Sequence, residues 1–159
     1  MIIREIAPED NAAVAQLIRG VFDELEIPKT GTAYEDASLD KMYTAYELPK
    51  HIYFVVGHEG IVVGGAGIAP LANGDGSVCE LQKMYFAKEA RGKGIGSKMM
   101  EQCLAYAKKV GFKKCYIETM PFMHDAQKLY KKFDFKYLDA PMGCTGHTSC
   151  PVWMLKDLL

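Results

Sequence analysis

Hydrophobic residues recur in the first half of the chain with the periods of both helices and strands. One stripe has the three-to-four-residue spacing of an amphipathic helix; its members are Ala13, Val14, Leu17, Ile18, Val21 and Leu25. Short apolar runs predict strands at residues 2–6, 51–56, 61–68 and 77–86. The last two runs flank an Asn-Gly-Asp-Gly sequence at 73–76, which is a strong hairpin signal. Ser38 is suited to cap a second helix that continues to about Tyr46.

The second half of the chain alternates strands with helices. One helical face ends at Gly111; it consists of Ile95, Met99, Cys103, Tyr106 and Val110. A strand is then predicted at 114–119, a helix at 125–133, and two final strands at 135–138 and 152–155. No internal repeat or interdomain linker interrupts this pattern. We therefore expect residues 1–159 to form a single α/β domain with a mixed sheet and crossover helices.

Composition is that of a globular protein able to bury a core, with 49% hydrophobic and 25% charged residues. No apolar run approaches the roughly 18 residues that cross a bilayer, so no membrane partner is expected. The first residues are apolar and then acidic, unlike the basic head of a signal peptide. Five cysteines, an odd number, are typical of reduced thiols. Together these features predict a cytoplasmic protein.

Charge is divided unevenly along the chain. The formal net charge is −1, from 19 basic and 20 acidic side chains, which argues against a general nucleic-acid binder. Residues 1–50 hold ten acidic and five basic side chains, a net of −5, whereas residues 51–159 have a net of +4. The two parts are therefore suited to ligands of opposite charge.

A glycine-rich turn at residues 91–97 directly follows a predicted strand and begins a predicted helix; it reads Arg91, Gly92, Lys93, Gly94, Ile95, Gly96 and Ser97. Glycines let the backbone approach a ligand, and the free N–H groups of a first helical turn bind anions. With Lys88 and Lys98 nearby, the turn suits a pyrophosphate. The spacing fits neither a Walker loop nor a dinucleotide fingerprint, because Ala87 and Met99 stand where glycines are needed.

The turn instead matches Arg/Gln-x-x-Gly-x-Gly/Ala, which resembles the acetyl-CoA pyrophosphate loop of the GCN5-related N-acetyltransferase (GNAT) superfamily. The sequence CELQKMYFAKEARGKGIGSKMM is similar to the central strand, loop and helix of that superfamily. CYIETM and DAQKLYKKFDF resemble its next strand and the helix that contains Ala-x-x-Leu-Tyr. The resemblance is strong over about residues 78–138. Two positions depart from it: Met123 stands where many members have Asn, and Asp134 replaces a usual Gly.

The resemblance implies a GNAT fold, whose sheet is mostly antiparallel, and an acetyl-CoA-dependent N-acetyltransferase. In such an enzyme a primary amine of a small molecule or peptide attacks the thioester directly, with no metal and no protein nucleophile. The implied coenzyme contacts are Met84, Tyr85 and Phe86, the loop residues Arg91, Gly92, Lys93, Gly94, Ile95, Gly96 and Ser97, and Ala126. The backbone amide near Phe86 would polarise the thioester oxygen. A homodimer joined at a strand edge is a further expectation from the superfamily.

Catalytic roles fall on three residues. Tyr130 occupies the position that protonates the coenzyme A thiolate in the superfamily; the alternative is an aromatic residue that only packs on its helix. Glu80 and Glu118 each lie on an otherwise apolar strand, where partial burial raises a carboxyl pKa. Either is a candidate base, either is equally suited to a structural ion pair or hydrogen bond, and a water relay to a more distant carboxylate is a third option.

The acceptor side is less well specified. The segment FDELEIPKTGTAYEDASLD is rich in acidic residues, and it predicts a small cationic amine as acceptor, with Glu24 and Tyr34 among the contacts. His147 is a further predicted contact. It lies in the spacing Cys144-x-x-His147-x-x-Cys150, which has three interpretations: a zinc site, a substrate-facing loop or a plain connection. Two other functions compete with the leading one: a non-catalytic acyl-CoA-binding module and a transferase of a different acyl group.

Overall fold

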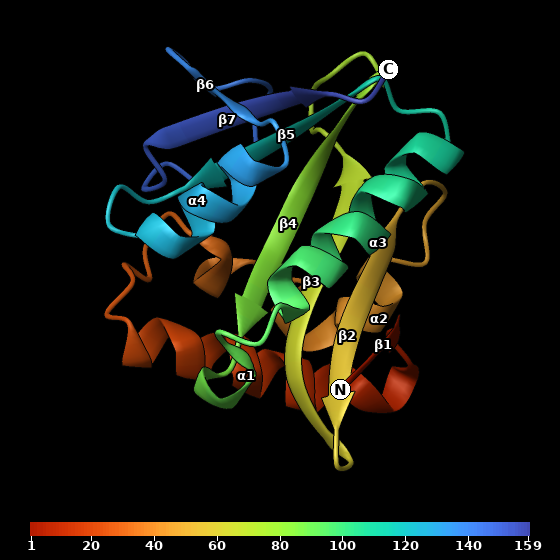
Figure 1. Cartoon of the computed structure of the whole chain (residues 1–159), viewed down its shortest axis with the longest axis vertical. Coiled ribbons are helices and arrows are strands. Elements are labelled where there is room, and N and C mark those ends of the chain that lie inside the picture. Colours follow the sequence, from red (N-terminus) through yellow and green to blue (C-terminus); the bar gives the residue numbers. More distant parts are fainter.

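The computed structural model describes residues 1–159 and contains one seven-stranded sheet in the order β1-β2-β3-β4-β5-β7-β6 (Figure 1). The strands are β1 (Ile2–Glu5), β2 (Ile52–His58), β3 (Ile61–Pro70), β4 (Val78–Phe86), β5 (Lys114–Thr119), β6 (Lys136–Leu138) and β7 (Val152–Asp157). Every neighbouring pair is antiparallel except β4 and β5, which are parallel. The expected mixed, mostly antiparallel sheet flanked by helices is confirmed.

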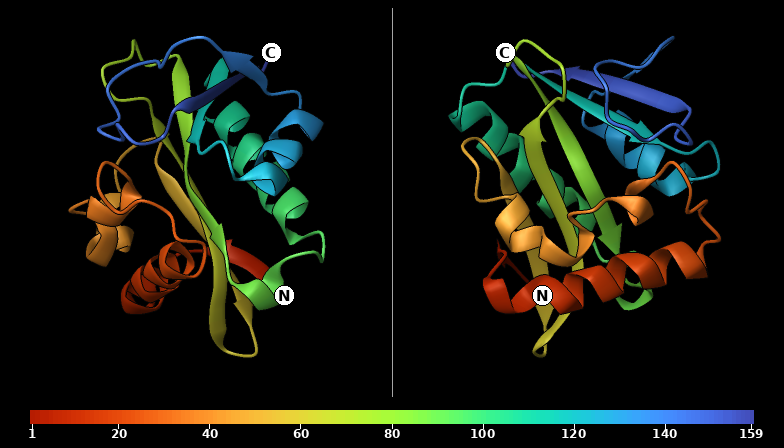
Figure 2. Two further views of the ribbon diagram at one scale, coloured as in Figure 1. Left: turned by 90° about the vertical axis from the view of Figure 1, so that its left-hand side faces the viewer. Right: turned by 180° about the vertical axis from the view of Figure 1, so that it is seen from behind.

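Helices cover both faces of the sheet (Figure 2). α1 (Asn11–Glu24) and α2 (Met42–Ala45) lie on one face, and α3 (Ile95–Lys109) and α4 (His124–Lys132) lie on the other. Each layer has its own hydrophobic core. Val14, Ile18 and Phe22 of α1 are buried on the first face, and Met99 and Cys103 of α3 are buried on the second. No helix has the length and apolar character needed to cross a membrane.

The second predicted helix differs from the observed structure. A short 3-10 turn at Leu39–Lys41 precedes α2, and the side chain of Ser38 makes no capping hydrogen bond. Lys41, the last residue of the turn, has a non-helical backbone conformation, with φ −133° and ψ 41°, so the turn and α2 do not form one continuous helix. The apolar side chains of this segment are nevertheless removed from solvent, because Leu39 and Met42 are both fully buried. Packing against the core therefore decides the backbone conformation of residues 38–46 more than their helical spacing does.

β4 and β5 are hydrogen-bonded to each other only near their beginnings. They pair only from Val78 to Glu80 on β4 and from Lys114 to Tyr116 on β5, and then diverge (Figure 1). A β-bulge accompanies the divergence: the register of β3 with β4 shifts, and Lys83 has a positive φ of 50°. A bulge places an extra residue on one strand and changes the face that later side chains occupy. The sheet is thereby opened at its centre.

The bulge explains which side chains of β4 share a face. Gln82 contacts Tyr46, and Lys83 contacts Asp36, so both side chains lie on the α1 side of the sheet. After the bulge, Met84 packs against the core under α3 whereas Tyr85 packs against the core under α1. Two consecutive polar side chains thus point to the same side.

Candidate active site

The divergence of β4 from β5 leaves a groove of about 610 Å³ that also contacts the end of α1, the start of α3 and one side of α4. Most of the expected coenzyme contacts line it: Met84, Tyr85, Phe86, Arg91, Gly92, Ile95, Gly96 and Ala126. Tyr130 lines it too. A larger hollow between α1 and the turn from β2 to β3 contains none of the predicted site residues except Glu24. The first groove is therefore the candidate coenzyme site.

The glycine-rich turn has the geometry of an anion-binding loop. Gly92 and Gly94 have φ values of 72° and 79°, in the left-handed region, and nothing lies within 4 Å of where a Cβ would stand. α3 begins at Ile95, and its first backbone hydrogen bond at this end runs from the Lys98 N–H to the Gly94 carbonyl. The N–H groups between these residues have no intrahelical partner, so they are free to bind an anion.

Arg91 is held by two different elements. Its Nε–H donates to the Phe86 carbonyl at 3.0 Å, and its Nη groups donate to both carboxylate oxygens of Glu24 at 2.7 and 2.9 Å. The Arg91 guanidinium lowers the pKa of Glu24. The structure therefore places Glu24 at the coenzyme loop, where it ties the end of α1 to the end of β4 through Arg91.

Tyr130 lies on α4 with its side chain 6% exposed, and its ring packs against Phe135 with 6.1 Å between ring centres. No protein group accepts or donates a hydrogen bond at its hydroxyl, and no buried side-chain polar atom of the protein lacks a partner. The hydroxyl is therefore accessible from the groove that Tyr130 lines. Burial raises the pKa of Tyr130, so the phenol retains its proton.

Glu80 lies on the opposite face of the sheet, 5% exposed. Gln82 Nε2 donates to Glu80 Oε1 at 2.7 Å, and the Tyr46 hydroxyl in turn donates to Gln82 Oε1 at 2.6 Å. Burial, opposed by the Gln82 hydrogen bond and aided by the nearby Glu118 carboxylate, raises the pKa of Glu80 to about 7. Glu80 thus changes its protonation state near neutrality, which is the property of an effective general base.

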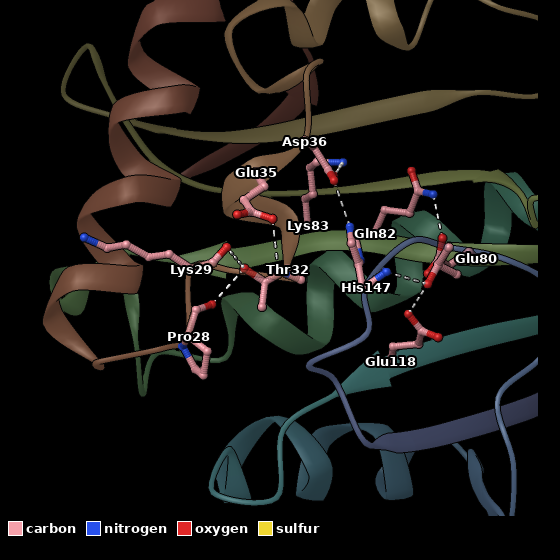
Figure 3. Close-up of polar contacts among 12 residues, drawn as sticks. Pro28, Lys29, Thr32, Glu35, Asp36, Glu80, Gln82, Lys83, Glu118 and His147 are labelled. Atoms are coloured by element: carbon pink, nitrogen blue, oxygen red, sulfur yellow. Dashed lines mark hydrogen bonds and ion pairs between the residues drawn. The ribbon is translucent and has the colours of Figure 1, made fainter.

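Both carboxylate oxygens of Glu118, which is labelled in Figure 3, accept hydrogen bonds. Oε2 accepts from the Tyr116 hydroxyl at 2.7 Å, and Oε1 accepts from Thr145 Oγ1 at 2.5 Å. Each hydroxyl also accepts a backbone N–H, from Met142 and His147 respectively, both at 3.2 Å. Glu118 therefore fastens the connection between β6 and β7 to β5.

Asp36 joins three segments of the chain (Figure 3). Its Oδ2 is 2.7 Å from Lys83 Nζ at the bulge, and its Oδ1 is 2.9 Å from His147 Nε2. Burial acts to raise the pKa of Asp36, but the His147 hydrogen bond and the Lys83 charge together outweigh it, so that pKa is lowered. The hydrogen bond to Asp36 raises the pKa of His147 against the opposing effect of burial.

Sequence reasoning did not single out Asp36 or Lys83 as site residues. Asp36 belongs to the acidic segment 22–40, which was the only signal for it, and nothing in the sequence marks Lys83 as the position of a bulge. Tyr34, a predicted acceptor contact, packs against Phe22, with 5.6 Å between ring centres. Of the Cys144-His147-Cys150 spacing, His147 bonds to Asp36, and no three His, Cys, Asp or Glu side chains converge as metal ligands.

Comparison with known proteins adds independent information. Residues 19–135 match the model of the acetyltransferase (GNAT) family. The Escherichia coli N-acetyltransferase YjgM is 43% identical over 158 residues, which cover 99% of this chain and 95% of that protein. A GNAT-family acetyltransferase of Staphylococcus aureus has a similar structure, with a TM-score of 0.87, 18% identity and 99% coverage of both chains. The acetyltransferase yncA of Salmonella typhimurium, solved with acetyl-CoA, has a TM-score of 0.79 and 19% identity, with 99% of this chain and 94% of that one covered.

Proposed function

The chain belongs to the acetyltransferase (GNAT) family, and we propose that it moves the acetyl group of acetyl-CoA directly onto a primary amine of a small molecule or peptide. One observation carries this proposal. The divergence of β4 from β5 opens the sheet between a phenol that keeps its proton and a carboxyl whose pKa is near 7. Those are the acid and the base that amine acetylation requires.

The groove has the features that a coenzyme A molecule needs. The loop at 91–97 offers free N–H groups and the positive end of α3 to the pyrophosphate. Phe86 and Tyr85 pair with β3 on one side only, because β5 has diverged on the other. The backbone groups at 84–86 that point away from β3 therefore face the open side, where they can meet the amides of the pantetheine arm, and the Phe86 carbonyl there also accepts from Arg91. Ala126 and Leu129 of α4 form an apolar wall opposite them.

Bound in this groove, acetyl-CoA supplies a thioester carbonyl carbon as the electrophile. The nitrogen of the neutral acceptor amine forms a bond to that carbon, and the carbon–sulfur bond then breaks. A backbone N–H near Phe86 stabilises the negative charge that develops on the carbonyl oxygen. The Tyr130 hydroxyl donates its proton to the leaving thiolate, and no protein side chain becomes acetylated.

Glu80 is the better candidate for the base that takes the proton from the acceptor nitrogen. Its Oε1 accepts one hydrogen bond from Gln82, and no other side chain occupies its second oxygen. Glu118 accepts two short hydroxyl hydrogen bonds, one on each oxygen, so a structural role suits it better. The burial of Glu80 also places its pKa where both protonation states are populated at neutral pH.

The charges on the acceptor side support a cationic acceptor. Lys83 and His147 share the single carboxylate of Asp36, and neither Glu80 nor Glu118 has an ion-pair partner. A substrate that bears a second positive charge would compensate these carboxylates, whereas a carboxylate-bearing amine would meet repulsion. Tyr34 remains a proposed contact on this side, next to the apolar ring of Phe22.

A thiol-release assay with acetyl-CoA and matched primary amines tests the proposal. The amines would have similar size and carry an additional ammonium, hydroxyl or carboxylate group, and calorimetry would measure coenzyme A binding in parallel. We expect micromolar-range binding of coenzyme A and fastest turnover with the diamines. Coenzyme binding without turnover on any amine would favour a non-catalytic acyl-CoA-binding module. Turnover only with a longer acyl-CoA would identify a transferase of a different acyl group.

A further inference from the structure

The connection between β6 and β7, residues 139–151, lies on the α1 side of the sheet, the face that holds Glu80. We call this connection the strap. Two separate interactions join it to the loop that follows α1. The Ser149 N–H donates to the Gly31 carbonyl at 3.1 Å, and His147 Nε2 bonds to Asp36 at 2.9 Å. The contact at Gly31 is close, because a Cβ there would be 2.6 Å from Thr148 Oγ1. Two segments distant in sequence thus form one wall.

Asp36 fixes this wall to the sheet through its second oxygen. Lys83, whose side chain is 7% exposed, reaches Asp36 from the bulge of β4, one residue after the Gln82 that bonds to Glu80. The three charged groups therefore link the loop, the strap and the strand that holds the proposed base (Figure 3). A half-buried pair of this kind is costly to break, because the remaining charge is left uncompensated.

The strap also borders the proposed base. Cys150, near its end, packs against the core under α1, and its thiol pKa is raised to about 12 by burial and then by the nearby Glu118, Glu80 and Asp36 carboxylates. The end of the strap therefore lies near Glu80 on the α1 side of the sheet.

We propose that Asp36 and His147 are positioning residues that hold the strap against the loop and so seat the acceptor next to Glu80. This inference rests on the proposed acetyltransferase function. It assigns His147 a role through Asp36 in place of direct contact with the substrate. Its anchor differs from that of Glu118, which fastens the strap at Thr145 and Met142 to β5 and not to the loop.

Labelling of Cys150 tests the inference without any acceptor. In a Cys144→Ser background, Cys150 is the one cysteine outside the buried core, since Cys79, Cys103 and Cys115 are fully buried. His147→Ala removes the bond to Asp36 but keeps the Asp36 charge that affects the Cys150 thiol. We expect it to raise the labelling rate with a thiol reagent at least severalfold. His147→Gln retains a donor for Asp36 and should restore most of the protection.

Steady-state kinetics then test the link to the acceptor. His147→Ala and Asp36→Asn should raise the acceptor KM about tenfold or more, with the coenzyme A Kd unchanged and a smaller effect on kcat. Asp157→Asn breaks an exposed pair with Lys114 and serves as the matched control that leaves KM unchanged. Unaltered labelling and KM would overturn the inference, as would a KM effect matched by a loss of coenzyme binding. If the wild type acetylates no amine, the proposed function fails, while the labelling result still reports on the pair.

Discussion

Glu80 and Tyr130 lie on opposite faces of the sheet, at the point where β4 separates from β5. Glu80 is the last residue of β4 that pairs with β5, and it faces the α1 side with Gln82 and Tyr46. Tyr130 belongs to the core on the α3 side and lines the groove that the separation opens. In the proposed mechanism, an acceptor and a coenzyme that approach from the two faces therefore meet between the proposed base and the proposed acid.

Replacement of Tyr130 by Phe should lower kcat by about a hundredfold or more, because the thiolate then leaves without its proton donor. The Kd for coenzyme A should not change, since the ring still packs against Phe135 and the hydroxyl makes no hydrogen bond within the protein. Steady-state turnover assays would measure kcat, and calorimetry on the same preparation would measure the Kd for coenzyme A. Equal turnover by the variant would remove Tyr130 from the mechanism.

Substitution of Glu80 and of Glu118 by Gln should affect the pH dependence of kcat/KM differently. With an amine of low pKa as acceptor, kcat/KM of the wild type should rise with pH through about 7, as Glu80 ionises. Glu80→Gln should lose this limb and about a hundredfold of activity, whereas Glu118→Gln should keep the limb. The pH–rate profiles of the three proteins decide the matter. A limb that persists in Glu80→Gln and vanishes in Glu118→Gln would reverse the assignment.

Burial of Glu80 should also affect the pH dependence of stability. Its pKa is about 7 in the folded state against 4.5 for an exposed carboxyl, so between these values the folded state binds more protons than the unfolded state. The free energy of unfolding should therefore fall as pH rises from about 5 to 7, by roughly 2 kcal/mol from this group. Urea titrations of wild type and Glu80→Gln at both pH values would show a difference in slope. Parallel pH dependence in the two proteins would contradict the folded-state pKa.

Alanine substitution at two glycines distinguishes an effect on coenzyme A binding from an effect of backbone strain on stability. Gly92 and Gly111 both have left-handed φ values, 72° and 96°, and neither has an atom within 4 Å of an added Cβ. Alanine at either position should cost about 1 kcal/mol of stability. Only Gly92→Ala should also weaken coenzyme A binding, by about tenfold, because its backbone lies in the anion-binding loop. Equal Kd values for the two variants, measured by calorimetry, would exclude this loop as the phosphate site.

The sequence was most informative where structure and chemistry are local. The hairpin at 73–76, the glycine-rich turn and the helix that follows it depend on neighbouring residues, and the fold class deduced from them is confirmed. The predicted helix from Ser38 is wrong in detail, because Leu39 and Met42 could be buried without a continuous helix. Local spacing alone does not reveal that tertiary choice.

Contacts between distant residues were beyond the reach of the sequence pattern. The Arg91–Glu24 pair spans 67 residues and the His147–Asp36 pair spans 111, so neither leaves a periodic signal. The bulge at Lys83 could not be predicted from the sequence either, because a lysine gives no indication of a positive φ. Burial of Glu80, which raises its pKa, follows from the packing of several segments and not from its own strand alone.

A single-turnover experiment tests direct acetyl transfer most closely. Enzyme in excess over acetyl-CoA would be mixed with and without a diamine, quenched on a millisecond scale, and examined by mass spectrometry. We predict that coenzyme A and acetylated amine form together at one rate, that unmodified protein is recovered, and that no coenzyme A is released without the amine. A burst of coenzyme A in the absence of amine, accompanied by acetylated protein, would contradict the mechanism.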